Sequence, residues 1–482
     1  MSDAPLAADS KRASTAGSDE AATPTGRLGR LRSAPFLRPL ADRDYRIFWG
    51  GESISVFGDQ FHFVALAWLV LELTGSGLAL GTVLTAAAIP RVILMLVGGA
   101  IADRIEPKTL IFRSNALRAL VVGIVAALII SGRVEIWQLV VMAVIFGAVD
   151  AFFYPAVSTF LPLLVPSERL TAANGLFQAT SQLIGLIGPA AAGVTVALIG
   201  TSLAFVLDAA SFAIAAVAIA LVHGGLRAGT RRVAETGAVD ADAGRAEALD
   251  AEAPASDAAG MSAAEPGPQA SVWRAIREGA RYTLRDPALR TLIILAAALN
   301  FAFTGPISIG LPWLAANRFE AGSAGFGIMI SGFGGGALIG AVLAGSIKPF
   351  RHRGAILLGI SGLLGVGLAL IGIAPGVVVV TGLMFVMGLG VGFINVNVVT
   401  WVQQRTETAM LGRVMSLMML GSQGLAPISL VITGVIIDAQ ATLVFVAAGA
   451  IILAAMGLGL VWRADRLLSF EPVPSEAPDT TP

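Results

Sequence analysis

Long apolar runs separated by short polar segments dominate this chain. Twelve runs occur, and they begin near Ile47, Leu78, Phe112, Trp137, Leu170, Leu203, Leu289, Phe326, Ile356, Val378, Val414 and Leu443. Each run has roughly 20 residues or more, the length that an α-helix needs to cross a hydrocarbon core of ~30 Å. The ~10-residue segments of alternating polarity that are typical of transmembrane β-barrels are not found in the sequence. The pattern therefore predicts an all-α membrane protein with twelve transmembrane helices.

Polar segments divide the chain into two halves. Residues 1–40 are acidic in places and lack an apolar run, so they are not expected to be a signal peptide, and residues 224–270 are rich in Ala, Gly, Asp and Glu. Segments of this composition bury too little apolar surface to fold. We therefore expect a disordered cytoplasmic tail, a disordered cytoplasmic linker between six-helix halves at 41–223 and 288–466, and a second disordered tail at 467–482.

The segment 271–287, which precedes the seventh run, alternates basic and apolar residues at helical spacing. The residues concerned are Arg274, Arg277, Arg281 and Arg285 beside Trp273, Ile276, Ala280 and Leu284. This pattern predicts an amphipathic helix that lies on the cytoplasmic leaflet. An ordinary solvated, charged helix is the alternative.

Basic residues in the loops predict the orientation of the spans, because Lys and Arg are enriched on the cytoplasmic side. One face holds Arg43, Arg46, Arg104, Lys108, Arg169, Arg231, Arg232, Lys348, Arg351, Arg353, Arg405, Arg413, Arg463 and Arg466. The opposite face holds only Arg133 and Arg318. We therefore expect both termini to be cytoplasmic.

The composition supports a membrane protein and excludes several chemistries. Hydrophobic residues make up 56% of the chain, charged residues 13%, and the mean hydropathy is +0.80, all outside the range of soluble domains. Because the chain has no cysteine and only three histidines, disulfides, thiolate nucleophiles and cysteine-ligated zinc are excluded, and a metal enzyme is not expected. We expect no cofactor.

The first run carries a polar stripe. Glu52, Ser55, Asp59 and His62 are three, four and three residues apart, which places them on one face of an α-helix. A charge at the bilayer centre costs ~2.5–3.5 kcal/mol, so such a face normally lines a bundle interior or a water-filled cavity. We therefore expect Asp59 to mark a cavity wall. Glu52 alternatively snorkels to the cytoplasmic surface, and His62 alternatively packs as a hydrogen-bonded core residue.

Other ionisable residues lie in runs of the same half: Arg91, Arg118, Asp150 and Asp208. A carboxyl group in a cavity can change its protonation with what occupies the cavity. We therefore predict proton coupling, with Asp59 as the first choice of proton carrier, Asp150 as the second, and Arg91 tuning one or both. Glu52 and Asp208 complete the predicted proton-coupling residues. Asp208 is alternatively a structural partner of a basic group or a helix cap, and Arg91 a static counter-ion.

The second half offers amides and hydroxyls in place of charges. We expect an adaptable apolar cavity wall with sparse polar contacts, formed by Phe57, Phe61, His62, Phe153, Tyr154, Asn300, Phe301, Phe393 and Asn395. Lipid-facing or inter-helix packing is the alternative role, which we expect for at least half of the aromatic residues.

The string "GGAIADRIEPKTL" follows the second run and resembles the loop signature of the major facilitator superfamily, G-x-L-A-D-R-x-G-R-K. Gly99, Asp103, Arg104 and Lys108 are among the matching positions, whereas Glu106 and Pro107 depart from it. The resemblance implies two pseudo-symmetric six-helix halves and a latch between them, in which Asp103 meets the positive end of the eleventh span near Arg413. Ordinary positive-inside sequence is the alternative.

The fifth run, "GLFQATSQLIGLIGPAAAG", resembles the antiporter motif of that superfamily. Gly175, Gly188, Pro189 and Gly193 match, while Ile184 and Ala192 replace two glycines. In this family the motif implies export by antiport, with small residues that allow tight helix crossing and a proline that kinks the helix. Plain helix packing is the alternative.

The strings "DYRIFWGGESISVFGDQF" and "AFVLDAASF" resemble the subgroup of that superfamily that holds enterobactin exporters, macrolide efflux pumps and mycobacterial multidrug pumps. The resemblance implies a proton-coupled antiporter in the cytoplasmic membrane of a bacterium that exports drug-like or siderophore-like molecules, and not an enzyme. The expected partners are the lipid bilayer, a small amphiphilic substrate and protons, without nucleic acid, for a chain that acts as a monomer. A proton-coupled importer of a metabolite is the alternative, and an ATP-driven pump is disfavoured because no G-x-x-x-x-G-K-[ST] loop is present.

Overall fold

The computed structural model of the chain describes residues 35–102, 105–223, 277, 281–346, 353–406 and 408–464. Within these ranges, twelve helices are long and apolar enough to cross a membrane. The predicted all-α class and the twelve spans are therefore confirmed. The predicted linker, the C-terminal tail and most of the predicted amphipathic segment lie outside the described residues, although residues 281–285 are helical.

One part of the predicted N-terminal tail is folded. The 3₁₀-helix η1 (Pro35–Ala41) packs against α6 (Ser167–Ile199), so the prediction of disorder is wrong for residues 35–40. The physical reason is apolar burial, because Leu37 and Leu40 pack against the hydrophobic cluster at this end of the half.

The N-terminal half contains six spanning helices. They are α2 (Arg43–Thr74), α3 (Gly77–Ala102), α4 (Pro107–Ile130), α5 (Ile136–Phe160), α6 and α7 (Thr201–Leu221), with a short 3₁₀ turn η2 (Leu161–Leu163) after α5. The helix α2 packs against α6 and α7, α3 packs against α5, and α4 packs against α5 and α7.

The C-terminal half also contains six spans, two of which are interrupted. The seventh span, Pro287–Arg318, consists of α10 (Pro287–Gly305), the π-helical turn η3 (Pro306–Gly310), α11 (Leu311–Trp313) and the π-helical turn η4 (Leu314–Arg318). Next come α12 (Gly322–Ser346), α13 (Arg353–Ile373) and α14 (Val377–Arg405). The helices α15 (Thr408–Gln423) and α16 (Ala426–Ile437) together form the eleventh span, and α17 (Ala441–Val461) is the twelfth. Pro306 and Pro312 lack an N–H group, which accounts for the irregular hydrogen bonding of the seventh span.

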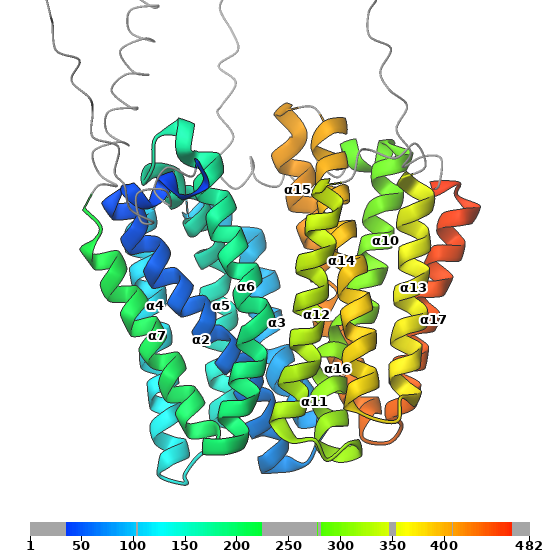
Figure 1. The fold of residues 1–482 in the computed structure, drawn as a ribbon, viewed down its shortest axis with the longest axis horizontal. Coiled ribbons are helices and arrows are strands. Elements are labelled where there is room, and N and C mark those ends of the chain that lie inside the picture. The colour runs from blue at the N-terminus through cyan, green and yellow to red at the C-terminus, as the bar shows by residue number, and fades with distance from the viewer. Residues whose placement is uncertain are drawn as a thin grey trace, which may run out of the picture.

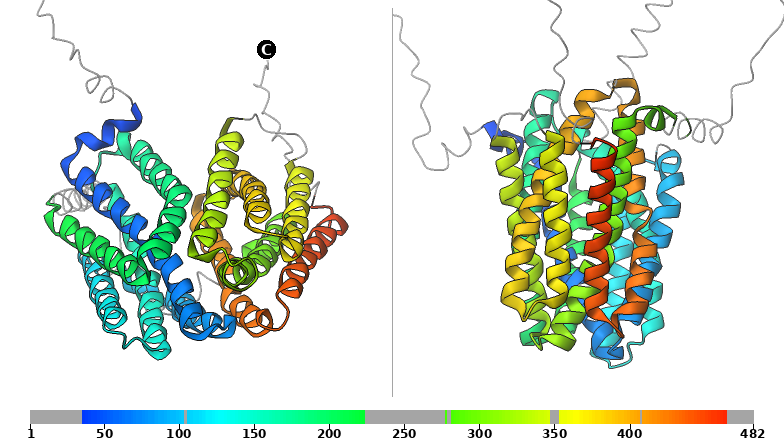
Figure 2. Two further views of the ribbon diagram at one scale, coloured as in Figure 1. Left: turned by 60° about the horizontal axis from the view of Figure 1, so that its bottom comes forward. Right: turned by 90° about the vertical axis from the view of Figure 1, so that its right-hand side faces the viewer.

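The two halves meet at one end of the molecule and spread apart at the other. Figure 1 shows them side by side, in contact near the start of α3 and apart near the starts of α2 and α10. The side view in Figure 2 shows the spans of both halves running along one common direction, as expected for helices that cross one bilayer. The halves meet on the side of the molecule where α3 and α12 begin and where α6 and α16 finish. We call this side the closed end.

Small residues bring the halves together at the closed end. A Cβ atom added to Gly193 of α6 would lie 2.4 Å from the carbonyl oxygen of Ser323 on α12. The Ser323 hydroxyl donates to the Gly193 carbonyl over 3.0 Å, and the Ala190 N–H donates to the Ser331 hydroxyl over 2.9 Å. These contacts need backbones in close approach, which small residues permit.

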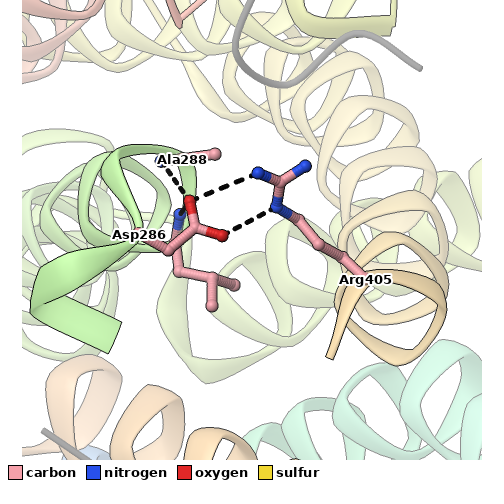
Figure 3. Close-up of polar contacts among 4 residues, drawn as sticks. Asp286, Ala288 and Arg405 are labelled. Atoms are coloured by element: carbon pink, nitrogen blue, oxygen red, sulfur yellow. Dashed lines mark hydrogen bonds and ion pairs between the residues drawn. The ribbon is translucent and has the colours of Figure 1, made fainter. Parts of the chain in front are cut away.

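At the opposite end of the C-terminal half, a carboxylate joins the start of α10 to the end of α14. Asp286 caps α10 by accepting hydrogen bonds from the N–H groups of Ala288 and Leu289, and it pairs with Arg405 at the end of α14, with 2.9 Å between Oδ2 and Nε (Figure 3). Partial burial raises the pKa of Asp286, but the hydrogen bonds from Arg405 and the backbone outweigh burial and leave the pKa below its usual range. The cap is therefore charged at neutral pH.

Candidate functional site in the N-terminal half

Four charged side chains lie near the middle of the N-terminal half. Asp59, Arg91, Arg118 and Asp150 lie close to the midpoints of α2, α3, α4 and α5 respectively. Both guanidinium groups pair with the carboxylate of Asp150, which thereby joins α3, α4 and α5. In the described part of the C-terminal half, by contrast, Lys, Arg, Asp and Glu lie at helix ends and in loops. The asymmetry between the halves that the sequence indicates is therefore present in three dimensions.

Arg118 is the most enclosed member of this group. Its side chain is only 4% exposed, whereas that of Arg91 is 40% exposed. The Arg118 guanidinium carbon lies 4.4 Å from the centroid of the Phe153 ring and 5.5 Å from that of Phe212. Aromatic faces and one carboxylate therefore replace the water that this cation would otherwise bind.

Asp59 differs from Asp150 in having no pairing partner. Within the described part of the chain, its carboxylate makes no hydrogen bond and no ion pair, and its side chain is half-buried. The ionisable side chains near enough to interact with it electrostatically are Arg118, Asp208, Asp150 and His62. Asp59 thus lies inside the half near other ionisable groups, and the prediction that it marks a cavity wall stays a prediction.

Glu52 lies on the same face of α2, nearer to the start of the helix. It is only 2% exposed, and Asn115 of α4 donates a hydrogen bond of 3.1 Å to its carboxylate. The Asn115 carbonyl oxygen is buried without a partner among the described residues. The alternative that Glu52 snorkels to the surface is therefore wrong, because its side chain is enclosed within the half and bound by Asn115.

His62 and Asp208 form the next pair along α2. The Asp208 carboxylate lies 2.9 Å from Nδ1 of His62, and Asp208 is fully buried inside α7. The His62 ring stacks on Phe146, with 4.6 Å between ring centroids. Asp208 is therefore the partner of a basic group, as one alternative held, and the helix-cap alternative is wrong because it lies well inside α7.

The polar stripe that the sequence predicts on α2 consequently faces other helices of its own half. Glu52 meets α4, His62 meets α7, and Asp59 lies between them, over a length of roughly 15 Å at 1.5 Å per residue. Spacing alone identified this stripe. The sequence analysis did not predict that Asn115 binds Glu52 or that Arg118 pairs with Asp150. Both are polar residues inside the third apolar run, three positions apart on one helix face.

The predicted cavity residues have mixed environments. Phe61 and Phe153 are buried in hydrophobic clusters, and Phe57 packs on Phe61 with 5.2 Å between centroids. Tyr154 is 60% exposed, and Asn395 is also exposed. The packing alternative therefore applies to Phe61 and Phe153, whose side chains are enclosed by neighbouring helices.

The predicted cavity residues of the C-terminal half are Asn300, Phe301 and Phe393, and all three are half-buried. The Asn300 side chain donates to the carbonyl of Ala296, one turn earlier in the same helix.

The predicted latch is only partly within the described residues. Asp103 and Arg104 lie outside them, and Gly99 lies in α3. The Lys108 ammonium donates over 2.7 Å to the carbonyl of Val222, so it binds the end of α7 in its own half. Arg413 is exposed near the start of α15 and donates to the sulfur of Met410.

Residues of the predicted antiporter-like motif all lie on α6 and contact different neighbours. Gly193 faces α12 across the halves, as described above. A Cβ on Gly188 would lie 2.5 Å from the Gln60 side chain of α2, and one on Gly175 would lie 3.3 Å from Phe36 of η1. The carbonyl of Pro189 faces Gly327 of α12. The motif therefore packs α6 against both its own half and the other half.

Comparison with known proteins identifies the class of this chain. Macrolide efflux protein A of Streptococcus pyogenes is 22% identical over 371 residues, which cover 77% of this chain and 83% of that protein. Multidrug efflux pump Tap of Mycolicibacterium fortuitum is 26% identical over 389 residues, which cover 79% and 86%.

Solved structures share the fold. A crystal structure of peptide transporter POT in complex with sulfate superposes with a TM-score of 0.62 at 16% identity, covering 89% of this chain and 96% of that one. The nucleoside transporter NupG superposes with a TM-score of 0.57 at 14% identity, covering 86% and 99%.

Both of these relatives, macrolide efflux protein A and Tap, are efflux proteins at low identity to this chain. Its described residues contain no cluster of His, Cys, Asp and Glu that could hold a metal ion. Residues 48–431 match the model of the Major Facilitator Superfamily, which is most of the chain. The chain therefore belongs to the Major Facilitator Superfamily and is a transporter, not an enzyme.

Proposed function

We propose that this transporter is a proton-coupled antiporter that exports amphiphilic, drug-like or siderophore-like molecules across the cytoplasmic membrane of a bacterium. The names of the relatives support export and a drug-like substrate class. The basic loops support cytoplasmic termini and a cytoplasmic linker. In that orientation the closed end faces outward, and the halves open toward the cytoplasm.

Alternation between the two halves provides the transport step. In this family of folds the two halves rock about a site near the bilayer midplane. The contacts of α6 with α12 and of α3 with α16 lie at the closed end. An outward-open state requires these contacts to separate while contacts at the other end form.

The unpaired carboxylate of Asp59 is the observation that carries the proposal of proton coupling. When Asp59, Asp150, Arg91 and Arg118 are all ionised, two negative and two positive charges cancel. Protonation of Asp59 leaves the group with one net positive charge. A cationic substrate and a proton therefore compete for the same negative charge, which is the condition for exchange of one for the other.

Asp150 has a different role in this proposal. Because two guanidinium groups hold its carboxylate, we assign it to positioning Arg91 and Arg118 and keep it as the second choice of proton carrier. Glu52 and the His62–Asp208 pair extend the polar stripe on either side of Asp59. They are the groups proposed to carry protons between Asp59 and the two ends of the half.

The C-terminal half supplies an apolar wall for the substrate. Within the described spans of this half, aromatic contacts such as Phe303 with Phe333, 5.6 Å between centroids, are not accompanied by charges at mid-span. Apolar surface with sparse amides accepts many amphiphilic shapes. The residues proposed to line it are Asn300, Phe301, Phe393 and Asn395, facing Phe57 and Tyr154 of the N-terminal half.

Proteoliposomes test the proposal. An efflux screen of antibiotics, dyes and siderophores in a pump-deficient host selects the substrate, and substrate-dependent proton flux is then measured with the parent and with Asp59→Asn. We expect Asp59→Asn to lose transport driven by a pH gradient and to retain exchange of labelled for unlabelled neutral substrate. Exchange of a cationic substrate should become slower, because the shared negative charge is lost. The matched control is Glu72→Gln, which changes an exposed carboxylate of the same helix. Full pH-gradient-driven transport by Asp59→Asn would remove Asp59 from the mechanism.

The same assay addresses direction and the coupling ion. Inside-out and right-side-out vesicles distinguish export from the alternative, proton-coupled import of a metabolite. Replacement of the proton gradient by a sodium gradient distinguishes the two ions.

A further inference from the structure

A carboxylate of the C-terminal half caps a helix of the N-terminal half. Asp438 directly follows α16 and accepts hydrogen bonds from the N–H groups of Gly77, at 2.7 Å, and Leu78, at 3.3 Å, in the first turn of α3. The Ser76 hydroxyl donates to the same carboxylate over 2.8 Å. A fourth donor, Nε1 of Trp313 at 3.0 Å, belongs to the half of Asp438 itself. Three of these four hydrogen bonds therefore cross between the halves.

The chemistry of a helix start explains why this contact is favourable. The first N–H groups of α3 have no acceptor within the helix, and the positive end of the helix dipole lies there. The Ser76 hydroxyl oxygen already accepts from Leu78 and Ala79 at 3.1 and 3.4 Å. When the halves separate, α3 keeps its serine cap but loses the carboxylate. The three crossing bonds of Asp438 therefore stabilise only the arrangement in which the closed end is shut.

Glycines at the crossing of α3 and α16 allow the close approach that this contact requires. Gly81 lies one turn after Gly77 on α3, and Gly434 lies one turn before Asp438. A Cβ added to Gly81 would lie 3.0 Å from the Cα of Gly434, and one added to Gly77 would lie 2.1 Å from the Ile437 side chain. The α3–α16 crossing therefore brings the two backbones together and delivers the carboxylate to the start of α3.

We propose that Asp438 is a positioning residue of the transport cycle, which holds the closed end shut by capping α3 across the halves and so sets the balance between the two access states. The inference rests on the proposed alternation between the halves. Partial burial raises the pKa of Asp438, but the hydrogen bonds from Gly77 and Ser76 lower the pKa below its usual range. Asp438 is therefore ionised and presents a full negative charge to α3.

Distance measurements between spin labels test the latch. Because the chain has no cysteine, labels can be placed at Ser131→Cys, after α4, and Val378→Cys, in the first turn of α14, without further changes. In the parent we expect mainly short distances across the closed end. In Asp438→Ala we expect the ratio of long to short distances to rise roughly tenfold, because charge-assisted hydrogen bonds to α3 are lost.

Two variants separate a latch from general packing. Trp313→Phe removes the donor within the same half and leaves the bonds across the halves, so its distance distribution should match that of the parent. Ser76→Ala removes one of the crossing donors together with the serine cap that α3 keeps when the halves separate, so it should shift the distribution less than Asp438→Ala. If Asp438→Ala does not fold, Asp438→Asn keeps one acceptor oxygen, and we expect an intermediate shift.

The outcomes distinguish this inference from the proposed function. The measurement requires neither substrate nor a proton gradient, so failure of the parent to export would count against the proposed function alone. An unchanged distribution in folded Asp438→Ala or Asp438→Asn would overturn the latch. An equal shift in Trp313→Phe would also overturn it, because that change leaves the crossing bonds in place.

Discussion

The carboxylate of Asp208 lies 2.9 Å from Nδ1 of His62, and it has no exposure to solvent. The other oxygen of Asp208 is buried without a hydrogen-bond partner among the described residues. His62 is therefore the group on which the stability of this buried carboxyl depends. The pair joins α2 to α7 at the level of Phe146, on which the His62 ring stacks.

Replacement of His62 by leucine should destabilise the protein more than replacement by glutamine. Leucine leaves the Asp208 carboxyl without a donor, at a cost of about 1–3 kcal/mol, whereas glutamine retains an N–H group. The melting temperature in detergent is expected to fall in the order parent, His62→Gln, His62→Leu. Adding Asp208→Leu to His62→Leu should recover part of the loss, because removal of both partners leaves no orphaned polar group. A melting temperature of His62→Leu equal to that of the parent would contradict this dependence.

The two arginines that pair with Asp150 should differ in importance. Arg118 is enclosed by aromatic rings, whereas Arg91 is half-exposed and better solvated. Asp150→Asn leaves both cations without compensation, and loss of one member of a buried pair costs about 3–5 kcal/mol. We expect Asp150→Asn and Arg118→Gln to lower the melting temperature strongly and Arg91→Gln to lower it little. Equal losses for the two arginine variants would show that burial does not decide their contribution.

The sequence predicts the spans and the polar stripe of α2, but it does not predict the partners of that stripe. Hydropathy determines where helices cross a bilayer, and helical periodicity places Asp59 and His62 on one face. The partner of His62 lies 146 positions away, and the residues that Asp438 caps lie about 360 positions away. Only the packing of the helices brings such groups together. Asp438 in particular is one polar residue in a short loop, and no local signal distinguishes it from a solvated surface carboxylate.

The stability contributed by Asp286 should depend on pH. Because its pKa in the folded protein lies below its usual 3.8, ionised Asp286 stabilises the fold above that value, and the contribution is lost as the pH falls through the lowered pKa. We expect the parent to melt at a higher temperature than Asp286→Asn near pH 6, and the difference to shrink below about pH 4. Asparagine still caps a helix, so the comparison isolates the charge that pairs with Arg405. A difference that grows on acidification would have the wrong sign for a lowered pKa.

Gly193 should be required for closure of the halves, whereas Gly185 on the same helix should not. A Cβ at Gly193 would lie 2.4 Å from the backbone oxygen of Ser323, but one at Gly185 would have no atom within 4 Å. Because the clash is with backbone, α6 and α12 must move apart, at a typical overpacking cost of about 1–3 kcal/mol. We therefore expect Gly193→Ala to reduce the export rate in proteoliposomes by roughly tenfold or more and Gly185→Ala to transport at the parental rate. Ser323→Ala removes the hydroxyl bond to Gly193 without a clash, and it should give a smaller loss if Gly193→Ala fails to fold. Equal rates for Gly193→Ala and Gly185→Ala would mean that the α6–α12 contact yields to a methyl group, and close approach at this point would then not be what holds the halves together.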